Sequence, residues 1–186
     1  HLEILLEDRS GAQLNFAELA REVGASAVTT KRWVEVFCLL HHGFLVRPWH
    51  RNVARALRKA PKWYLRDWSG IEDPGARAET FVACHLLKAV EGWTDIGLGE
   101  FDLRYLRDKE KREVDFLILR DRRPWCLVEV KASDTRLSPS LAHFQKRTNL
   151  VRAIAAAMDE ATDQRATVVH PADPSREARV AGLAAP

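Results

Sequence analysis

The chain has 186 residues, of which 46% are hydrophobic and 30% charged, and its formal net charge at pH 7 is +3. This composition is that of an ordinary soluble globular protein. No run approaches the ~20 apolar residues that a membrane helix needs, and the three cysteines lack metal-ligand spacing. We therefore expect a cytoplasmic protein of one large or two small domains, with reduced thiols and no membrane contact.

Two helices are expected near the start of the chain. A hydrophobic stripe from Phe16 to Val23 follows Asn15, which can cap a helix, and Gly24 supplies a turn. A second helix is expected from Ser26 to His42, ended by Gly43. Its candidate core residues are Val28, Trp33 or Val34, Val36, Phe37 and Leu40.

A basic segment, Arg47 to Arg66, comes next and overlaps two strand-like runs, F-L-V-R-P-W and K-W-Y-L-R-D. Helix, turn, helix and hairpin is the order of a winged helix-turn-helix. The segment contains basic residues and aromatic residues but no acidic residue, so it can contact phosphates with salt-sensitive affinity. A solvated loop over packed aromatics, or a docking face for another domain, is the alternative. Its basic residues are Arg47, Arg51, Arg55, Arg58, Lys59, Lys62 and Arg66. Lys31 and Arg32, in the second helix, are placed to meet base edges or phosphates.

A third helix is expected after the linker W-S-G-I-E-D-P-G, with Asp73 as its cap and Pro74 as its first residue. Glu79 lies in its first turns, close to the hydrophobic stripe. That stripe consists of Phe81, Val82, Leu86 or Leu87, and Val90.

Three strands and a long helix are expected in the second half. The strand candidates are F-D-L-R-Y-L-R-D, E-V-D-F-L-I-L-R and W-C-L-V-E-V-K. Hydrophobic residues at spacings of three and four then predict a helix from about Ser138 to Glu160. R-A-T-V-V-H-P is a last short strand, and no structure is predicted for the tail rich in Pro and Ala that follows.

Three charged residues interrupt the apolar strands. Glu129 and Lys131 share one face of a strand because side chains alternate with period two. Asp115 reaches the same face if its strand and theirs pair as a hairpin. With the backbone carbonyl of Val130, the two carboxylates offer the hard oxygen ligands that suit Mg²⁺. The alternative is an edge strand whose Glu and Lys face solvent as a weak pair.

The order of these elements resembles the PD-(D/E)xK nuclease-like superfamily over residues 70 to about 171. The matching runs are G-A-R-A-E-T-F-V, R-Y-L-R-D-K-E-K-R-E-V-D-F-L-I and C-L-V-E-V-K-A-S. The whole chain resembles the region C-terminal to the ATP-binding module in a group of prokaryotic AAA-type ATPases. Its N-terminal match rests on F-A-E-L-A-R-E-V-G-A-S, T-K-R-W and R-N-V-A-R-A-L-R-K-A-P-K-W-Y.

These resemblances imply an α/β (α+β) protein with a winged-helix domain at 1–68 and a nuclease-like domain at 69–186. The nuclease-like domain is expected to have a central mixed sheet flanked by helices. The implied catalytic residues are Glu79, Asp115, Glu129, Lys131 and Gln145. Asp115, Glu129 and Val130 are the implied ligands of Mg²⁺ or Mn²⁺.

The expected activity is metal-dependent phosphodiester hydrolysis on nucleic acid, with DNA as the expected partner. The chain contains no G-x-x-x-x-G-K-[ST] run and therefore no ATP site. The ATPase module is expected in the same full-length polypeptide, of which this chain is a fragment or a truncated form. Two alternatives are a non-catalytic binding module that keeps the nuclease fold, and a winged-helix regulator that its C-terminal domain assembles into a homo-oligomer.

Overall fold

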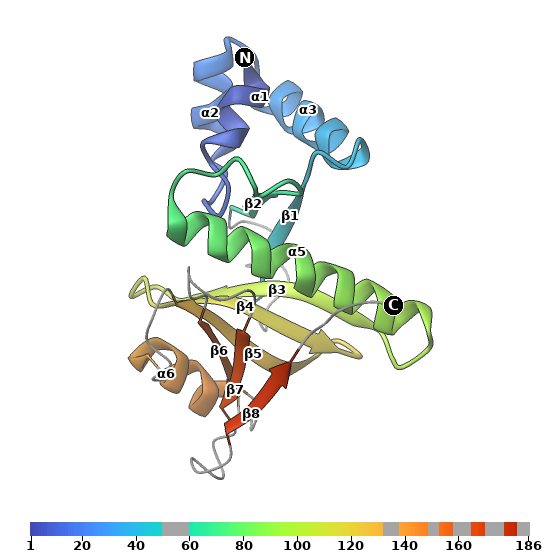
Figure 1. Ribbon diagram of the computed structural model, residues 1–186. Helices are drawn as coiled ribbons and strands as arrows, with labels where there is room; N and C mark the ends of the chain where they lie inside the picture. Colours follow the sequence, from blue (N-terminus) through green and yellow to red (C-terminus); the bar gives the residue numbers. More distant parts are fainter. Residues whose placement is uncertain (50–59, 132–137, 149–152, 158–164, 170–176, 182–186) are drawn as a thin grey trace. The chain divides into compact units, whose positions relative to one another are not determined.

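The computed structural model describes residues 1–49, 60–131, 138–148, 153–157, 165–169 and 177–181 (Figure 1). It is a mixed α/β protein that divides into two compact units, residues 1–84 and 85–186. The helix α5, Pro74–Asp95, runs across the division. The boundary expected between 68 and 69 stays a prediction. No helix within these described ranges is both long enough and apolar enough to cross a membrane.

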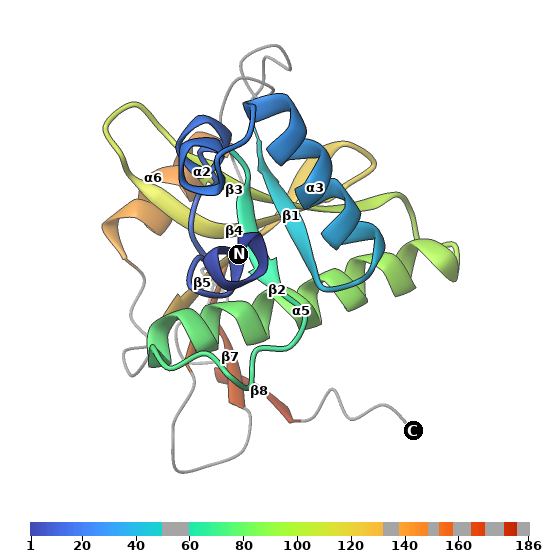
Figure 2. The same cartoon turned by 90° about the horizontal axis from the view of Figure 1, so that it is seen from above.

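The first unit consists of short helices and a two-stranded antiparallel hairpin. Its elements before α5 are α1 (Leu2–Glu7), α2 (Phe16–Val23), α3 (Ala27–Leu39), β1 (Gly43–Pro48) and β2 (Lys62–Leu65). The predicted cap of α2 is confirmed, because the Asn15 side chain accepts hydrogen bonds from the backbone N–H groups of Ala17 and Glu18 at 3.1 and 3.3 Å. Gly24 ends the helix with a left-handed φ of 69°. Figure 2 shows α3 beside β1 in this unit.

The end of α3 differs from the prediction. The helix stops at Leu39, and His41 takes a left-handed φ of 58° in the turn that follows. Gly43 is the first residue of β1, and a Cβ at this position would collide with the ring of Trp63. Gly43 is therefore required by close packing across the hairpin and not by the end of the helix.

The buried face of α3 also differs from the prediction. Thr30 and Val34 are fully buried, while Val28, Val36 and Leu40 are exposed. Thr30 is accommodated in the core because its hydroxyl donates to the Ser26 carbonyl at 3.0 Å. The core cluster of this unit consists of Leu2, Leu6, Leu14, Leu19, Val34, Trp63 and Leu65.

The start of α5 is as predicted. The Asp73 carboxylate accepts a hydrogen bond from the Ala76 backbone N–H at 2.6 Å, and Pro74 is the first helical residue. Phe81 and Val90 are buried, with Phe81 in an edge-on contact with Trp68 at 4.9 Å between ring centroids. The other predicted stripe residues, Val82, Leu86 and Leu87, are only partly buried.

The second unit contains a mixed sheet whose described strands lie side by side in chain order. They are β3 (Phe101–Arg107), β4 (Glu113–Arg120), β5 (Arg123–Lys131), β6 (Ala153–Ala157), β7 (Arg165–Val169) and β8 (Glu177–Ala181). The pair β5–β6 is parallel and the other pairs are antiparallel. The helix α6, Pro139–Thr148, connects the parallel pair and packs on β4 and β5 through the buried side chains of Leu141 and Phe144.

The long helix predicted from Ser138 to Glu160 is wrong in its second half. The helix α6 ends at Thr148, and residues 153–157 form β6, paired with Leu127–Lys131 of β5. The alanine-rich run has high helix propensity. It is nevertheless a strand because it pairs in parallel with β5, and such tertiary contacts override local propensity. The tail, for which no structure was predicted, contributes β8.

Asp108 holds the turn between β3 and β4. Its carboxylate, 4% exposed, accepts a hydrogen bond from Arg112 Nε at 2.6 Å and another from the Arg112 backbone N–H at 3.0 Å. His143 Nε2 on α6 lies 3.8 Å from the same carboxylate. Desolvation raises the pKa of Asp108, but the hydrogen bonds and charge of Arg112 outweigh it and leave that pKa below the ordinary value.

Acid is therefore expected to weaken this turn. A carboxyl whose pKa is lowered by folding stabilises the folded state above its unfolded pKa of about 3.9, and this contribution is lost as the pH falls through the folded pKa. We expect Asp108→Asn to reduce the slope of unfolding free energy against pH below about pH 4. Urea unfolding at a series of pH values measures this slope, and a slope equal to that of the wild type would contradict the assignment.

Candidate active site

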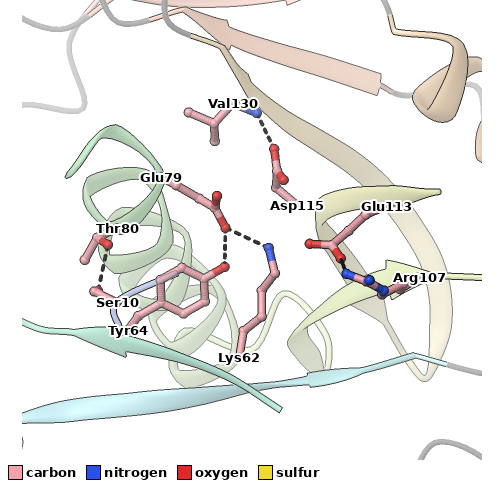
Figure 3. Close-up of polar contacts among 9 residues, drawn as sticks. All are labelled: Ser10, Lys62, Tyr64, Glu79, Thr80, Arg107, Glu113, Asp115 and Val130. Atoms are coloured by element: carbon pink, nitrogen blue, oxygen red, sulfur yellow. Dashed lines mark hydrogen bonds and ion pairs between the residues drawn. The ribbon is translucent and has the colours of Figure 1, made fainter. Parts of the chain in front are cut away.

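Asp115 and Glu129 come together at one end of the β4–β5 pairing. At this end the last pair of the antiparallel register is Phe116 opposite Val128. Asp115 and Glu129 are the residues next to that pair on the two strands. Residues opposite one another point to the same face of a sheet. The Asp115 carboxylate accepts a hydrogen bond from the Val130 backbone N–H at 2.8 Å (Figure 3). The predicted hairpin is thus present. If its register continues by one residue, the carboxylates of Asp115 and Glu129 lie on one face of the sheet.

Glu129 lies between a lysine and the amino end of α6. Its Oε2 accepts a hydrogen bond from the Ser138 backbone N–H at 3.3 Å and lies 3.7 Å from Lys131 Nζ. Ser138 directly precedes the helix, and its hydroxyl accepts from the Leu141 backbone N–H at 3.0 Å. A carboxylate at this position is stabilised by the positive end of the helix dipole.

The alternative of a solvent-facing edge strand is excluded for β5. The strand has β4 on one side and β6 on the other. The side chains of Glu129 and Lys131 are only 13% and 20% exposed. Charged side chains covered to this degree are costly unless they are paired or hold a ligand.

Glu79 is held by two side chains from β2. Its Oε1 accepts a hydrogen bond from Lys62 Nζ at 2.8 Å and another from the Tyr64 hydroxyl at 2.6 Å, as Figure 3 shows. Lys62 is a nearly buried lysine, with a side-chain exposure of 5%, against 21% for Glu79. One residue further along α5, the hydroxyls of Thr80 and Ser10 are 2.8 Å apart. The first unit therefore fixes the orientation of the Glu79 carboxylate.

Two family models match the chain, one after the other. A domain of unknown function, DUF8612, matches residues 3–71, and a second, DUF4143, matches residues 74–172. The chain belongs to the DUF4143 family. No curated protein and no solved structure matches the chain.

The DUF4143 segment contains every residue that the sequence assigned to catalysis. Asp115, Glu129 and Lys131 lie together in the second unit, where Gln145 is half-buried on α6. Glu79 belongs to the first unit as the chain divides. The catalytic roles of all five residues stay predictions.

The basic residues expected to bind nucleic acid have several different environments. Arg51, Arg55, Arg58 and Lys59 lie outside the described residues. Arg47 on β1 is exposed, as are Lys31 and Arg32 on α3. Lys62 is not part of a solvated basic surface, because it is buried against Glu79.

Lys62 and Tyr64 are neighbours of the candidate site residue Glu79 that the sequence did not predict. The signal was present, because both lie on one face of the apolar run K-W-Y-L by the alternation of a strand. A lysine inside such a run is as unusual as Glu129 and Lys131 in β5. Like them, it indicates a residue of a site. Its place among the basic residues from Arg47 to Arg66 instead predicts an exposed lysine.

The cysteines of this DUF4143 protein are free thiols, as predicted. The Cys84 thiol donates to the Leu65 carbonyl at 3.3 Å. Desolvation by burial raises its pKa to about 11. Cys84 is therefore protonated at neutral pH, and a structural thiol rather than a nucleophile.

Proposed function

We propose that this chain is the nuclease-like, nucleic-acid-binding part of an AAA-type ATPase and hydrolyses phosphodiester bonds with Mg²⁺ or Mn²⁺. In this proposal the second unit has the PD-(D/E)xK fold and the helices and hairpin of the first unit form a winged helix. The observation that carries the proposal is the hydrogen bond from the N–H of Val130, the residue after Glu129, to the Asp115 carboxylate. This bond connects the Asp115 carboxylate to the backbone of β5 next to Glu129.

The donor atoms around Asp115 fit a hard divalent cation. In an antiparallel ladder the N–H and C=O groups of one residue point to the same side of the strand. Because the Val130 N–H points to Asp115, its carbonyl is directed to that side as well. Asp115, Glu129 and the Val130 carbonyl then supply only oxygen ligands, as Mg²⁺ prefers.

Each residue has a defined part in this proposal. Asp115 and Glu129 hold the cation, which when bound would supply Lewis-acid stabilisation of phosphate charge and a more acidic water. Lys131, next to Glu129, places a positive charge where negative charge develops on the phosphate. Glu79, which Lys62 and Tyr64 orient within the first unit, and Gln145 on α6 keep the supporting roles that the resemblance implies.

A non-catalytic module that keeps this fold is the second candidate. One observation favours it: Glu79 already has a lysine partner at 2.8 Å and a tyrosine partner at 2.6 Å. A carboxylate satisfied in this way is stable without a metal or a substrate. In this case the basic segment that includes Arg47 would bind DNA or a protein.

The deciding experiment is a cleavage assay on the purified chain. Supercoiled plasmid and labelled oligonucleotides are incubated with Mg²⁺, Mn²⁺ or EDTA. We expect cleavage that requires the cation and falls by about 10² to 10³ or more in Asp115→Asn and in Lys131→Met. Lys146→Met, which changes an exposed lysine of α6, is the matched control and is expected to cut like the wild type.

Two outcomes would contradict the proposal. Equal cleavage in the wild type and both site variants would identify a contaminating nuclease. Absence of cleavage under every condition, with DNA binding intact, would favour the non-catalytic module.

A further inference from the structure

Two glutamates and a histidine come together in the first unit, away from the carboxylates of β4 and β5. Glu3 and Glu7 each offer a carboxylate oxygen and His42 offers a ring nitrogen. These three atoms all lie within 4.8 Å of one another. Glu3 and Glu7 are exposed and His42 is half-buried, so the group is open to solvent on one side.

The packing of α1 explains where its two glutamates lie. Leu2 and Leu6 are one turn apart and are buried in the core cluster that includes Trp63. Glu3 and Glu7 each follow one of these leucines, so they form the neighbouring row along the helix. Burial of the leucine row therefore fixes the glutamate row as well.

His42 is held in the turn between α3 and β1. Its backbone N–H donates to the Phe37 carbonyl and its carbonyl accepts from the Arg66 N–H, both at 3.0 Å. Its ring centroid lies 5.2 Å from that of Phe37 and 6.4 Å from that of Trp63. The imidazole thus has a fixed backbone and aromatic neighbours.

The two glutamates are not neutralised by any side chain in the described ranges. Neither carboxylate accepts a hydrogen bond or forms an ion pair there. Like charges four residues apart on a helix repel each other. Glu22 on α2 provides the contrast, because Arg9 donates to both of its carboxylate oxygens, at 2.8 and 2.7 Å.

The His42 ring provides a second and independent sign of a ligand. Its Nε2 is buried and has no hydrogen-bond partner among the described residues. A buried polar atom without a partner is unfavourable, and a neutral imidazole nitrogen is a common metal ligand. One divalent cation would neutralise the carboxylates and coordinate the imidazole, whereas the carboxylates would repel an anion.

We propose that Glu3, Glu7 and His42 bind one Zn²⁺ ion, which holds α1 against the turn before β1. Zn²⁺ binds imidazole nitrogen and carboxylate oxygen at about 2.0 to 2.2 Å, so its ligand atoms lie about 3 to 4 Å apart. Rotation of the exposed glutamate side chains closes the remaining distance. Three protein ligands leave a position for water. The imidazole favours Zn²⁺ over Mg²⁺, which prefers oxygen ligands alone.

Isothermal titration calorimetry of the full chain with ZnCl₂ tests the site. Glu3→Gln, Glu7→Gln and His42→Gln are each expected to lower the affinity for Zn²⁺ at least about tenfold. Glu18→Gln removes an exposed carboxylate of α2 and is the matched control, expected to bind like the wild type. Asp115→Asn is also expected to keep this binding, so the zinc site and the proposed nuclease site can fail separately.

Nuclear magnetic resonance of the histidine rings identifies the ligand directly. Zn²⁺ is expected to shift a ring ¹⁵N resonance of His42 and to leave the exposed His41 unchanged. Circular dichroism establishes that each variant is folded. A wild type that binds no Zn²⁺, unchanged affinity in both Glu3→Gln and Glu7→Gln, or a zinc-dependent shift that spares His42 would each overturn the proposal.

Discussion

Replacing Lys62 with alanine is expected to destabilise the protein by about 3 kcal/mol, the lower end of the range for breaking a buried ion pair. The substitution removes the ammonium group 2.8 Å from Glu79, whose carboxylate is only 21% exposed. The Tyr64 hydroxyl bond to that carboxylate remains and limits the loss. The midpoint and the slope of the urea unfolding transition give the change in the free energy of unfolding.

A second lysine–glutamate pair in the same unit provides the control. Lys31 and Glu35 are about half exposed and 3.9 Å apart, so Lys31→Ala is expected to cost less than about 0.5 kcal/mol. The double variant Lys62→Ala with Glu79→Ala is expected to lose less than the sum of the two single variants, because neither charge is left alone. Equal losses in the free energy of unfolding for Lys62→Ala and Lys31→Ala would contradict the expectation that the buried Lys62–Glu79 pair matters more than the exposed pair.

Divalent cations are expected to stabilise the protein if Asp115 and Glu129 bind them. A cation at 100 times its dissociation constant adds about 2.7 kcal/mol to the free energy of unfolding. Asp115→Asn and Glu129→Gln are expected to abolish this gain, since an amide keeps the shape of the side chain but not its charge. In Asp115→Asn the amide oxygen would still accept the Val130 N–H, so the local fold is expected to persist.

Unfolding in MgCl₂ or MnCl₂, beside NaCl of equal ionic strength, measures this gain without reference to cleavage. Stabilisation without cleavage would support the non-catalytic module with a bound cation. Equal stabilisation in the wild type and both site variants would place the cation elsewhere and contradict the proposed ligands.

The local features of this protein could be predicted from its sequence because they depend on neighbours along the chain. The caps Asn15 and Asp73 and the strands β3, β4 and β5 were all predicted. The shared face of Glu129 and Lys131 follows from strand alternation alone. The prediction that Asp115 shares this face requires only that two successive strands pair as a hairpin.

The features that failed depend on contacts between distant parts of the chain. The run at 153–157 has helix-forming residues, and only its pairing with β5 makes it a strand. The face of α3 that is buried was set by the hairpin and α2, and the alternative choice of Trp33 or Val34 could not be settled from spacing. The partner of Lys62 lies 17 residues away on another element.

The connection from β5 through α6 to β6 leads us to expect an order in which the two carboxylates are positioned during folding. The hairpins β3–β4 and β4–β5 close over short loops, whereas a parallel pair must wait for its crossover helix. Asp115 can therefore meet Val130 early in folding, but Glu129 gains the Ser138 N–H only when α6 docks. A chain released from the ribosome before α6 is made would hold one carboxylate in place and leave the other without its support.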